Sequence, residues 1–191
     1  MKSASLVNEN FVVLIPGGSV LSASMKLQEL IKSNINIKDE RLFPEIHITI
    51  DRIKKERTKE AIEIIEKITN EFPKISIALN DFSCYHLSQD KFLVLNINKT
   101  NSLSKYAKKI HQELYMKNIT TINNYDEWNF HITILSNLFS RRSISDEEFN
   151  DICKLFSDLA SPCVADIDRV DIWKPTLKPD KKLIYSYLWE E

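Results

Sequence analysis

The tetrapeptide His-Ile-Thr-Ile occurs twice in this chain, at His47–Ile50 and at His131–Ile134, and it constrains the fold more than any other feature. Because side chains in a β-strand alternate between the two faces, each copy predicts a strand with a histidine and a threonine on one face. The two isoleucines of each copy then point to the other face, into a core. Two such strands side by side would present two imidazoles and two hydroxyls to one small pocket. That set suits acid–base chemistry on an oxyanionic group.

A structural origin is the alternative for this repeat. A histidine followed two residues later by serine or threonine arises by chance for roughly one histidine in ten at ordinary residue usage. One copy alone would therefore carry no weight. Two copies with isoleucines at the same positions are much harder to attribute to chance, although two imidazoles hydrogen-bonded within a sheet would produce the same pattern.

Composition and charge exclude several classes of function. A chain of 191 residues suits one domain or two small lobes that share a core. The net charge of −1 provides no basic field for duplex nucleic acid, so we expect contact only with an end, a short single strand or a nucleotide. The apolar segment Phe11–Pro16 is too short to span a membrane and is typical of a first strand.

Cysteines and glycines narrow the chemistry further. Cys84, Cys153 and Cys163 are odd in number and have no metal-like spacing, which favours reduced thiols in a cytoplasmic protein. Since neither His-Glu-x-x-His nor Cys-x-x-Cys occurs, the sequence predicts no metal site and no cofactor. The only glycines are Gly17 and Gly18, which excludes a phosphate-binding P-loop.

Hydrophobic periodicity predicts the same order of elements in both halves of the chain. Strands are expected at residues 11–16, 45–50, 75–82, 92–97, around 131–134, 163–173 and 183–189. Helices are expected at residues 20–33, 55–72, 102–115 and 145–159, the last opened by a capping box from Ser145 to Glu148. This order indicates an internal duplication with a pseudo-twofold axis. We expect one bilobal domain over residues 1–191, with lobe-forming repeats at about 11–97 and 92–190.

The paired motifs, His47-Ile48-Thr49 and His131-Ile132-Thr133, resemble those of the 2H phosphoesterase superfamily, also called LigT-like or 2′-5′ RNA ligase-like proteins. The resemblance covers nearly the whole chain in element order. It implies an α+β bilobal fold, in which two antiparallel sheets flank a cleft and the helices lie outside. It also implies metal-independent hydrolysis of 2′,3′-cyclic phosphates on nucleotides or RNA ends, with 2′-5′ ligation as the reverse reaction. Many members carry a proline and a basic residue before the motif, whereas Glu45-Ile46 and Asn129-Phe130 stand here.

The chemistry of such a reaction assigns roles to the motif residues. One of His47 and His131 would act as base and the other as acid, and the symmetry of the sequence does not say which. Thr49 and Thr133 would hydrogen-bond the phosphate oxygens. Further substrate-binding candidates are three aromatic residues and one cation: Phe43, Tyr85, Trp128 and Arg141. Of the other residues, His111 is expected on a helix surface and Trp173 in the core.

The expected partner is a nucleotide or short RNA end with a cyclic phosphate, bound by a monomer in the cytoplasm. Neither a membrane nor duplex DNA is expected as a partner. Two other functions stay open at this point. One is cleavage of a cyclic nucleotide or cyclic oligonucleotide signal, and the other is non-catalytic binding of an RNA end or phosphorylated ligand.

Overall fold

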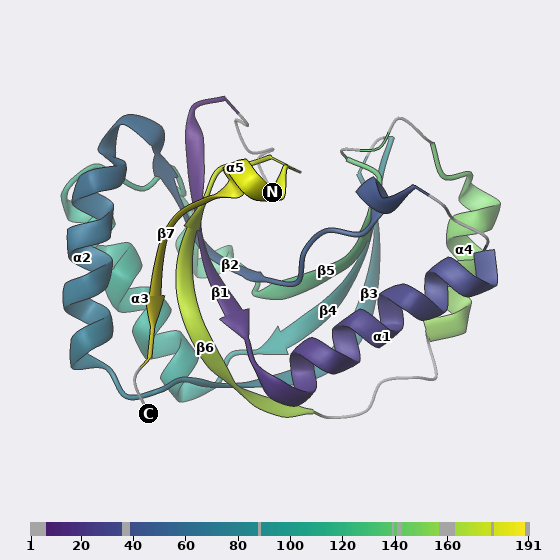
Figure 1. Cartoon of the computed structure of the whole chain (residues 1–191), viewed down its shortest axis with the longest axis horizontal. Helices are drawn as coiled ribbons and strands as arrows, with labels where there is room; N and C mark the ends of the chain where they lie inside the picture. Colours follow the sequence, from purple (N-terminus) through teal and green to yellow (C-terminus); the bar gives the residue numbers. More distant parts are fainter. Residues whose placement is uncertain are drawn as a thin grey trace.

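Two groups of antiparallel strands, joined along a common strand, form the frame of the molecule (Figure 1). The computed structural model describes residues 7–35, 39–87, 89–138, 140, 143–156, 163–176 and 178–189. Within these ranges the strands are β1 (Glu9–Pro16), β2 (Ile48–Lys54), β3 (Ser76–Leu87), β4 (Asp90–Asn98), β5 (His131–Ser136), β6 (Val164–Trp173) and β7 (Leu183–Leu188). The α-helices of the same ranges are α1 (Gly18–Ile35), α2 (Thr58–Glu71), α3 (Asn101–Met116), α4 (Asp146–Phe156) and α5 (Pro179–Lys182). None of these helices combines the length and the apolar character needed to cross a lipid bilayer.

Strand β6 belongs to both halves of the molecule. One half has the strand order β2-β1-β6-β7, and the other has the order β5-β4-β3-β6. The motif strands β2 and β5 meet edge to edge, with Ile48 paired to Ile132. Helices α2 and α3 cover the outside of the first half, and α1 and α4 cover the second (Figure 1). The α+β bilobal architecture predicted from the sequence is therefore confirmed.

The two halves do not coincide with the two sequence repeats. The order β2-β1-β6 in one half corresponds to β5-β4-β3 in the other, as a duplication requires. Strand β3 of the first repeat nevertheless pairs with β4 of the second, and β6 of the second repeat pairs with β1 of the first. Strand β3 thus completes the half that holds β4 and β5, and β6 joins the half that holds β1 and β2. Since each half needs strands from both repeats, neither repeat can complete its sheet alone.

The first motif strand starts later than the periodicity predicts. A strand was expected from residue 45, but β2 begins at Ile48, which is paired with Leu14 of β1. Strand β1 ends at Pro16, which has no N–H to donate, and the chain then turns at Gly17 into α1. Ile15 and Pro16 continue β1 past this pair, but they pair with β6 and not with β2, so β2 begins at Ile48.

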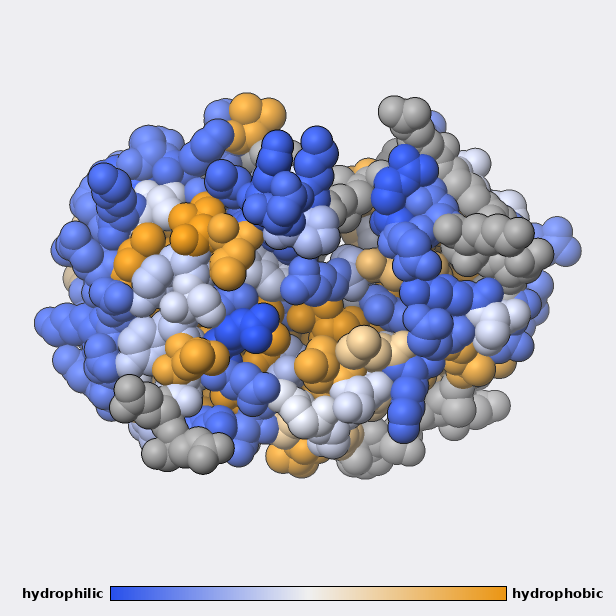
Figure 2. Space-filling model, in the orientation of Figure 1, coloured by the Kyte–Doolittle hydropathy of each residue, from blue (hydrophilic) through white to orange (hydrophobic). Residues whose placement is uncertain are grey.

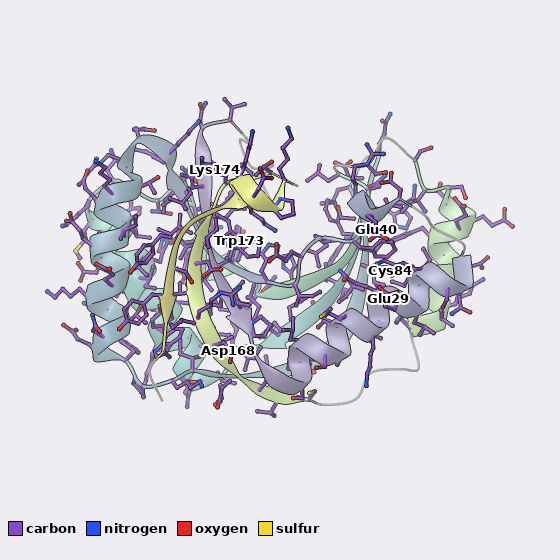
Figure 3. The ribbon with its side chains drawn as sticks, viewed as in Figure 1. Glu29, Glu40, Cys84, Asp168, Trp173 and Lys174 are labelled. Atoms are coloured by element: carbon purple, nitrogen blue, oxygen red, sulfur yellow. A yellow bond between two sulfur atoms is a disulfide. The ribbon has the colours of Figure 1, made fainter. Side chains whose placement is uncertain are left out.

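A disulfide between Cys84 in β3 and Cys153 in α4 corrects the expectation that the thiols are reduced. Cys163 is free. The two bonded residues are 69 positions apart in the sequence, so their spacing resembles no local motif. They meet because α4 packs on β3, as the contact between the Phe82 and Phe156 rings also shows. Figure 3 labels Cys84 on this side of the molecule.

Candidate active site

The motif histidines and threonines share one face of the joined strands. His47 and Thr49 are half-buried, whereas the isoleucines beside them, Ile48 and Ile50, are fully buried in the main core. The second motif has the same burial pattern. The alternation predicted from the sequence is therefore confirmed for both copies. Figure 2 shows the surface hollowed between the two halves.

The antiparallel contact between β2 and β5 brings the two motifs together. Because Ile48 pairs with Ile132, the same register places the position of His47 opposite Thr133 and that of Thr49 opposite His131. The two motifs therefore lie next to each other where β2 and β5 meet. This arrangement is the basis for treating them as one candidate site.

Both imidazoles are oriented in the same way by their own chain. His47 Nδ1 lies 2.6 Å from the carbonyl oxygen of Glu45, and His131 Nδ1 lies 3.1 Å from that of Asn129. A carbonyl oxygen only accepts hydrogen bonds, so Nδ1 carries the hydrogen in each ring. The Nε2 atom of each neutral ring is thereby left as the proton acceptor.

The electrostatic environment keeps both rings neutral near pH 7. Burial lowers the pKa of His47 to about 4, and the positive charges of Lys182 and His131 add to this effect against the hydrogen bond to Glu45. Burial also lowers the pKa of His131, and the Asn129 carbonyl opposes the change. The charge of Lys182 contributes to the lowered pKa of His47 but not to that of His131, so the two motifs are not equivalent.

Each motif strand is braced by the first helix of the other repeat. Gln28 in α1 donates through Nε2 to the Ile134 carbonyl of β5 at 3.2 Å. Asp51 follows the first motif directly, and its carboxylate lies 2.8 Å from Nδ1 of His111 in α3. Thr120, which follows α3, donates to the same carboxylate at 2.6 Å. His111 is buried in this network, so its expected place on a helix surface was wrong. His111 and Asp51 are 60 residues apart in the sequence, so helical periodicity could not predict that they meet.

The walls of the cleft differ between the halves. Next to β2, a small apolar cluster of Val13, Ile15 and Trp173 lies apart from the main core. Trp173 is buried as expected, yet it belongs to this cleft cluster, and its ring centroid lies 4.9 Å from that of His47. Next to β5, Asn96 pairs with His131 and donates to Asp81 and Ser83 of β3. One wall is therefore apolar and the other carries a polar network.

The four additional substrate-binding candidates fall in different places. Tyr85 is 46% exposed and lies on the face of β3 opposite Cys84, the residue bonded to α4, so it faces the cleft side. Trp128 donates to the Thr49 carbonyl at 3.0 Å and so closes the free edge of β2. Phe43 packs partly against the main core under Lys32 of α1. Arg141 lies outside the described residues.

Two further residues beside the histidines were not singled out from the sequence, Lys182 and Asn96. Asn96 reaches the site because β4 pairs with β5, whereas Lys182 lies at the end of α5 and reaches it through its contacts with Glu45 and Trp173. The only sequence signal was an alternating strand for Asn96. Among the described residues, no group of three or more His, Cys, Asp or Glu side chains could hold a metal ion.

Replacing either motif threonine by valine is expected to weaken the binding of inorganic phosphate by roughly 10- to 100-fold. A hydrogen bond to a charged group contributes about 1.5–3 kcal/mol, and valine keeps the shape of the side chain without the hydroxyl. The measurement compares Thr49→Val and Thr133→Val with Thr49→Ser and Thr133→Ser, which retain the hydroxyl. Equal phosphate affinity of the valine and serine variants would contradict a role for the hydroxyls.

Several solved structures share this fold. A phosphoesterase superposes with a TM-score of 0.59 at 12% identity, covering 96% of this chain and 99% of the other. E. coli LigT complexed with NADP+ gives 0.58 at 10% identity, covering 96% and 98%, and Kluyveromyces marxianus Usb1 gives 0.52 at 11% identity, covering 95% and 98%. No family model and no curated protein matches the sequence.

These similarities define the class of fold. The phosphoesterase, LigT and Usb1 structures are those of 2H phosphoesterases, and they match this chain over nearly its whole length. This chain has the LigT-like 2H phosphoesterase fold, as its paired motifs predicted. At this level of identity the similarity shows the fold alone.

Proposed function

We propose that this protein is a metal-independent phosphodiesterase that opens 2′,3′-cyclic phosphates on nucleotides or short RNA ends, acting as a monomer. The observation that carries the proposal is the pair of imidazoles, each anchored through Nδ1 to a backbone carbonyl and each opposite a threonine. Two proton-transfer groups and two hydroxyl donors are what the opening of a cyclic phosphodiester requires.

The two histidines have complementary tasks in this reaction. His47 takes a proton from water through Nε2, and the water oxygen forms a bond to phosphorus. His131, in its protonated form, gives a proton to the ribose oxygen as the phosphorus–oxygen bond breaks. We assign the base to His47 because the charges of Lys182 and His131 disfavour its protonation. Thr49 and Thr133 donate to the non-bridging oxygens.

Ligands of the LigT neighbour support a nucleotide substrate. Structures of E. coli LigT have been solved with phosphate, ATP, NADP+ and 3′-AMP. In this chain, the exposed ring of Tyr85 is placed to stack on a base, an interaction worth about 1–3 kcal/mol in single-strand binders. We therefore place the phosphate at the histidines and the base towards β3.

A hydrolysis panel tests the proposal. The purified protein, with EDTA present, is incubated with 2′,3′-cyclic nucleotides, short RNAs with cyclic ends, and cyclic di- and trinucleotides. Opening of the 2′,3′-cyclic ends alone is the expected result. Turnover confined to the cyclic di- or trinucleotides would replace the proposal by a signal phosphodiesterase. Binding of every member without turnover would replace it by a non-catalytic binding function.

The pH dependence of kcat/KM follows from the two histidines. This parameter reports the free protein, in which the base must be neutral and the acid protonated. Activity is expected to rise as the pH increases through about 4, the pKa at which His47 loses its proton. It should fall again as His131 loses its proton, and the pKa of His131 lies below its usual value of 6.5. The optimum should lie on the acidic side of neutrality. A profile that is flat from pH 5 to 9 would contradict the pairing.

We propose the cytoplasm as the location of the protein. The bond between Cys84 and Cys153 argues against this location, because disulfides are rare in reducing compartments, and its state in cells tests the proposal. Alkylation of thiols in intact cells, before lysis, should label both residues if the protein resides there. Complete protection of both residues would place it in an oxidising compartment.

A further inference from the structure

A lysine from the far end of the chain lies beside the first motif histidine. Lys182 is the last residue of α5, the short helix that connects β6 to β7. Its carbonyl oxygen accepts a hydrogen bond of 2.8 Å from the Lys174 N–H, which fixes its backbone against the end of β6. Figure 3 shows Trp173 and Lys174 at this end of β6, below and beside α5.

The ammonium group of Lys182 rests on an aromatic ring that also contacts His47. Lys182 Nζ lies 3.7 Å from the centroid of the Trp173 ring, a cation–π geometry. Trp173 itself is only 2% exposed, and its Nε1 donates to the buried Asp171 carboxylate at 3.0 Å. The Trp173 ring is thus fixed in place, and it contacts both the Lys182 ammonium and the His47 ring.

Lys182 forms an ion pair with Glu45, in which Lys182 is held in place and Glu45 is free to move. Lys182 Nζ donates to Glu45 Oε2 at 3.0 Å. The Lys182 side chain is 14% exposed, whereas that of Glu45 is 53% exposed. Glu45 can therefore turn into solvent while the ammonium stays in place. Because Glu45 is about half exposed, its carboxylate can return to water when another anion takes its place beside Lys182.

The ammonium group of Lys182 is partly buried and has the carboxylates of Glu45 and Asp171 as its charged neighbours. Burial lowers the pKa of Lys182, and the hydrogen bond to Glu45 and the charge of Asp171 oppose this change. A cation that is partly desolvated binds a phosphate oxygen more strongly than one in bulk water. The charge also reaches His47, so the cation lies within electrostatic range of the proposed reacting atoms.

We propose that Lys182 binds a non-bridging phosphate oxygen of the substrate, and that Glu45 is the carboxylate which this phosphate displaces. The proposal rests on the proposed function for the identity of the substrate. It explains the acidic residue before the first motif, because Glu45 is the partner of a lysine 137 positions away. A cation supplied by the C-terminal part of the chain takes the place of a basic neighbour beside the motif.

Binding of inorganic phosphate and of adenosine 2′-monophosphate, measured by titration calorimetry, tests this proposal without turnover. Lys182→Met keeps the apolar stem and removes the charge, and it is expected to weaken both ligands about 10- to 100-fold. Lys181→Met on the same helix is the matched control, because Lys181 is exposed, and it should bind as the wild type does. Glu45→Gln should bind phosphate more tightly, since the competing carboxylate is gone.

A purely structural ion pair gives a different pattern. In that case Lys182→Met and Glu45→Gln would weaken binding to the same extent, which would overturn the proposal, as would wild-type affinity in Lys182→Met. If Lys182→Met does not fold, Glu45→Gln decides alone, and the absence of a gain in phosphate affinity would overturn it. Loss of phosphate binding in Lys182→Met, together with no turnover in the hydrolysis panel, would uphold this inference and refute the proposed reaction.

Discussion

Replacing either motif histidine by alanine is expected to lower kcat/KM for a 2′,3′-cyclic nucleotide by about 10²–10⁴-fold. In the proposed reaction, His47→Ala removes the group that accepts the proton of water, and His131→Ala removes the donor to the leaving oxygen. Each truncation leaves the buried isoleucines on the other face of its strand untouched, so the fold should be kept. The measurement is steady-state hydrolysis with EDTA present, with circular dichroism to check the fold.

A third histidine provides the control for this pair of variants. His86 lies on β3 beside Asp146 and Phe149, and its side chain is 45% exposed. His86→Ala should retain activity within a few fold. In the double variant His47→Ala/His131→Ala, the losses should combine to less than their product, because the two groups act in one transition state. Unchanged activity in either single variant would contradict the two-histidine reaction.

Removing the disulfide is expected to lower the free energy of unfolding by about 2–4 kcal/mol. The bond closes a loop of 69 residues between β3 and α4, and closing a loop of that size restricts the unfolded chain considerably. The measurement is chemical denaturation of Cys84→Ser/Cys153→Ser against the wild type. The site should keep its activity, because the bond lies on the α4 side of β3 and not on the cleft side.

The free cysteine supplies the control for this second prediction. Cys163→Ser should leave the free energy of unfolding nearly unchanged, and dithiothreitol should destabilise the wild type but not the double serine variant. Thiol counting in the unfolded protein without reductant should give one reactive group. A count of three reactive groups would contradict the bond.

The repeated motif predicted the site well because its information is local. Strand alternation alone places His47 with Thr49 and buries Ile48 and Ile50, and the structure confirms this arrangement. The capping box was local too: Ser145 and Glu148 exchange backbone and side-chain hydrogen bonds at the start of α4. Such features depend on neighbours within a few residues, which a sequence displays directly.

Features that depend on distant pairing could not be predicted in the same way. The burial of His111 depends on Asp51, and Lys182 pairs with Glu45, 137 positions away. The pairing of β3 with β4 and of β6 with β1 is invisible to periodicity, because β3 and β6 look alike to a local pattern. The disulfide was missed for the same reason. The contact of Lys182 also breaks the symmetry of the two motifs, and our proposal that His47 is the base rests in part on it.

The most direct test of the account is an NMR titration of the two imidazoles with long-range ¹H–¹⁵N correlation. At pH 7 the account predicts that His47 and His131 both carry hydrogen on Nδ1 and none on Nε2, with His47 protonating only near pH 4. Added inorganic phosphate should shift both Nε2 resonances along one binding curve. A response from only one ring, or hydrogen on Nε2 in the neutral form, would contradict a shared phosphate site.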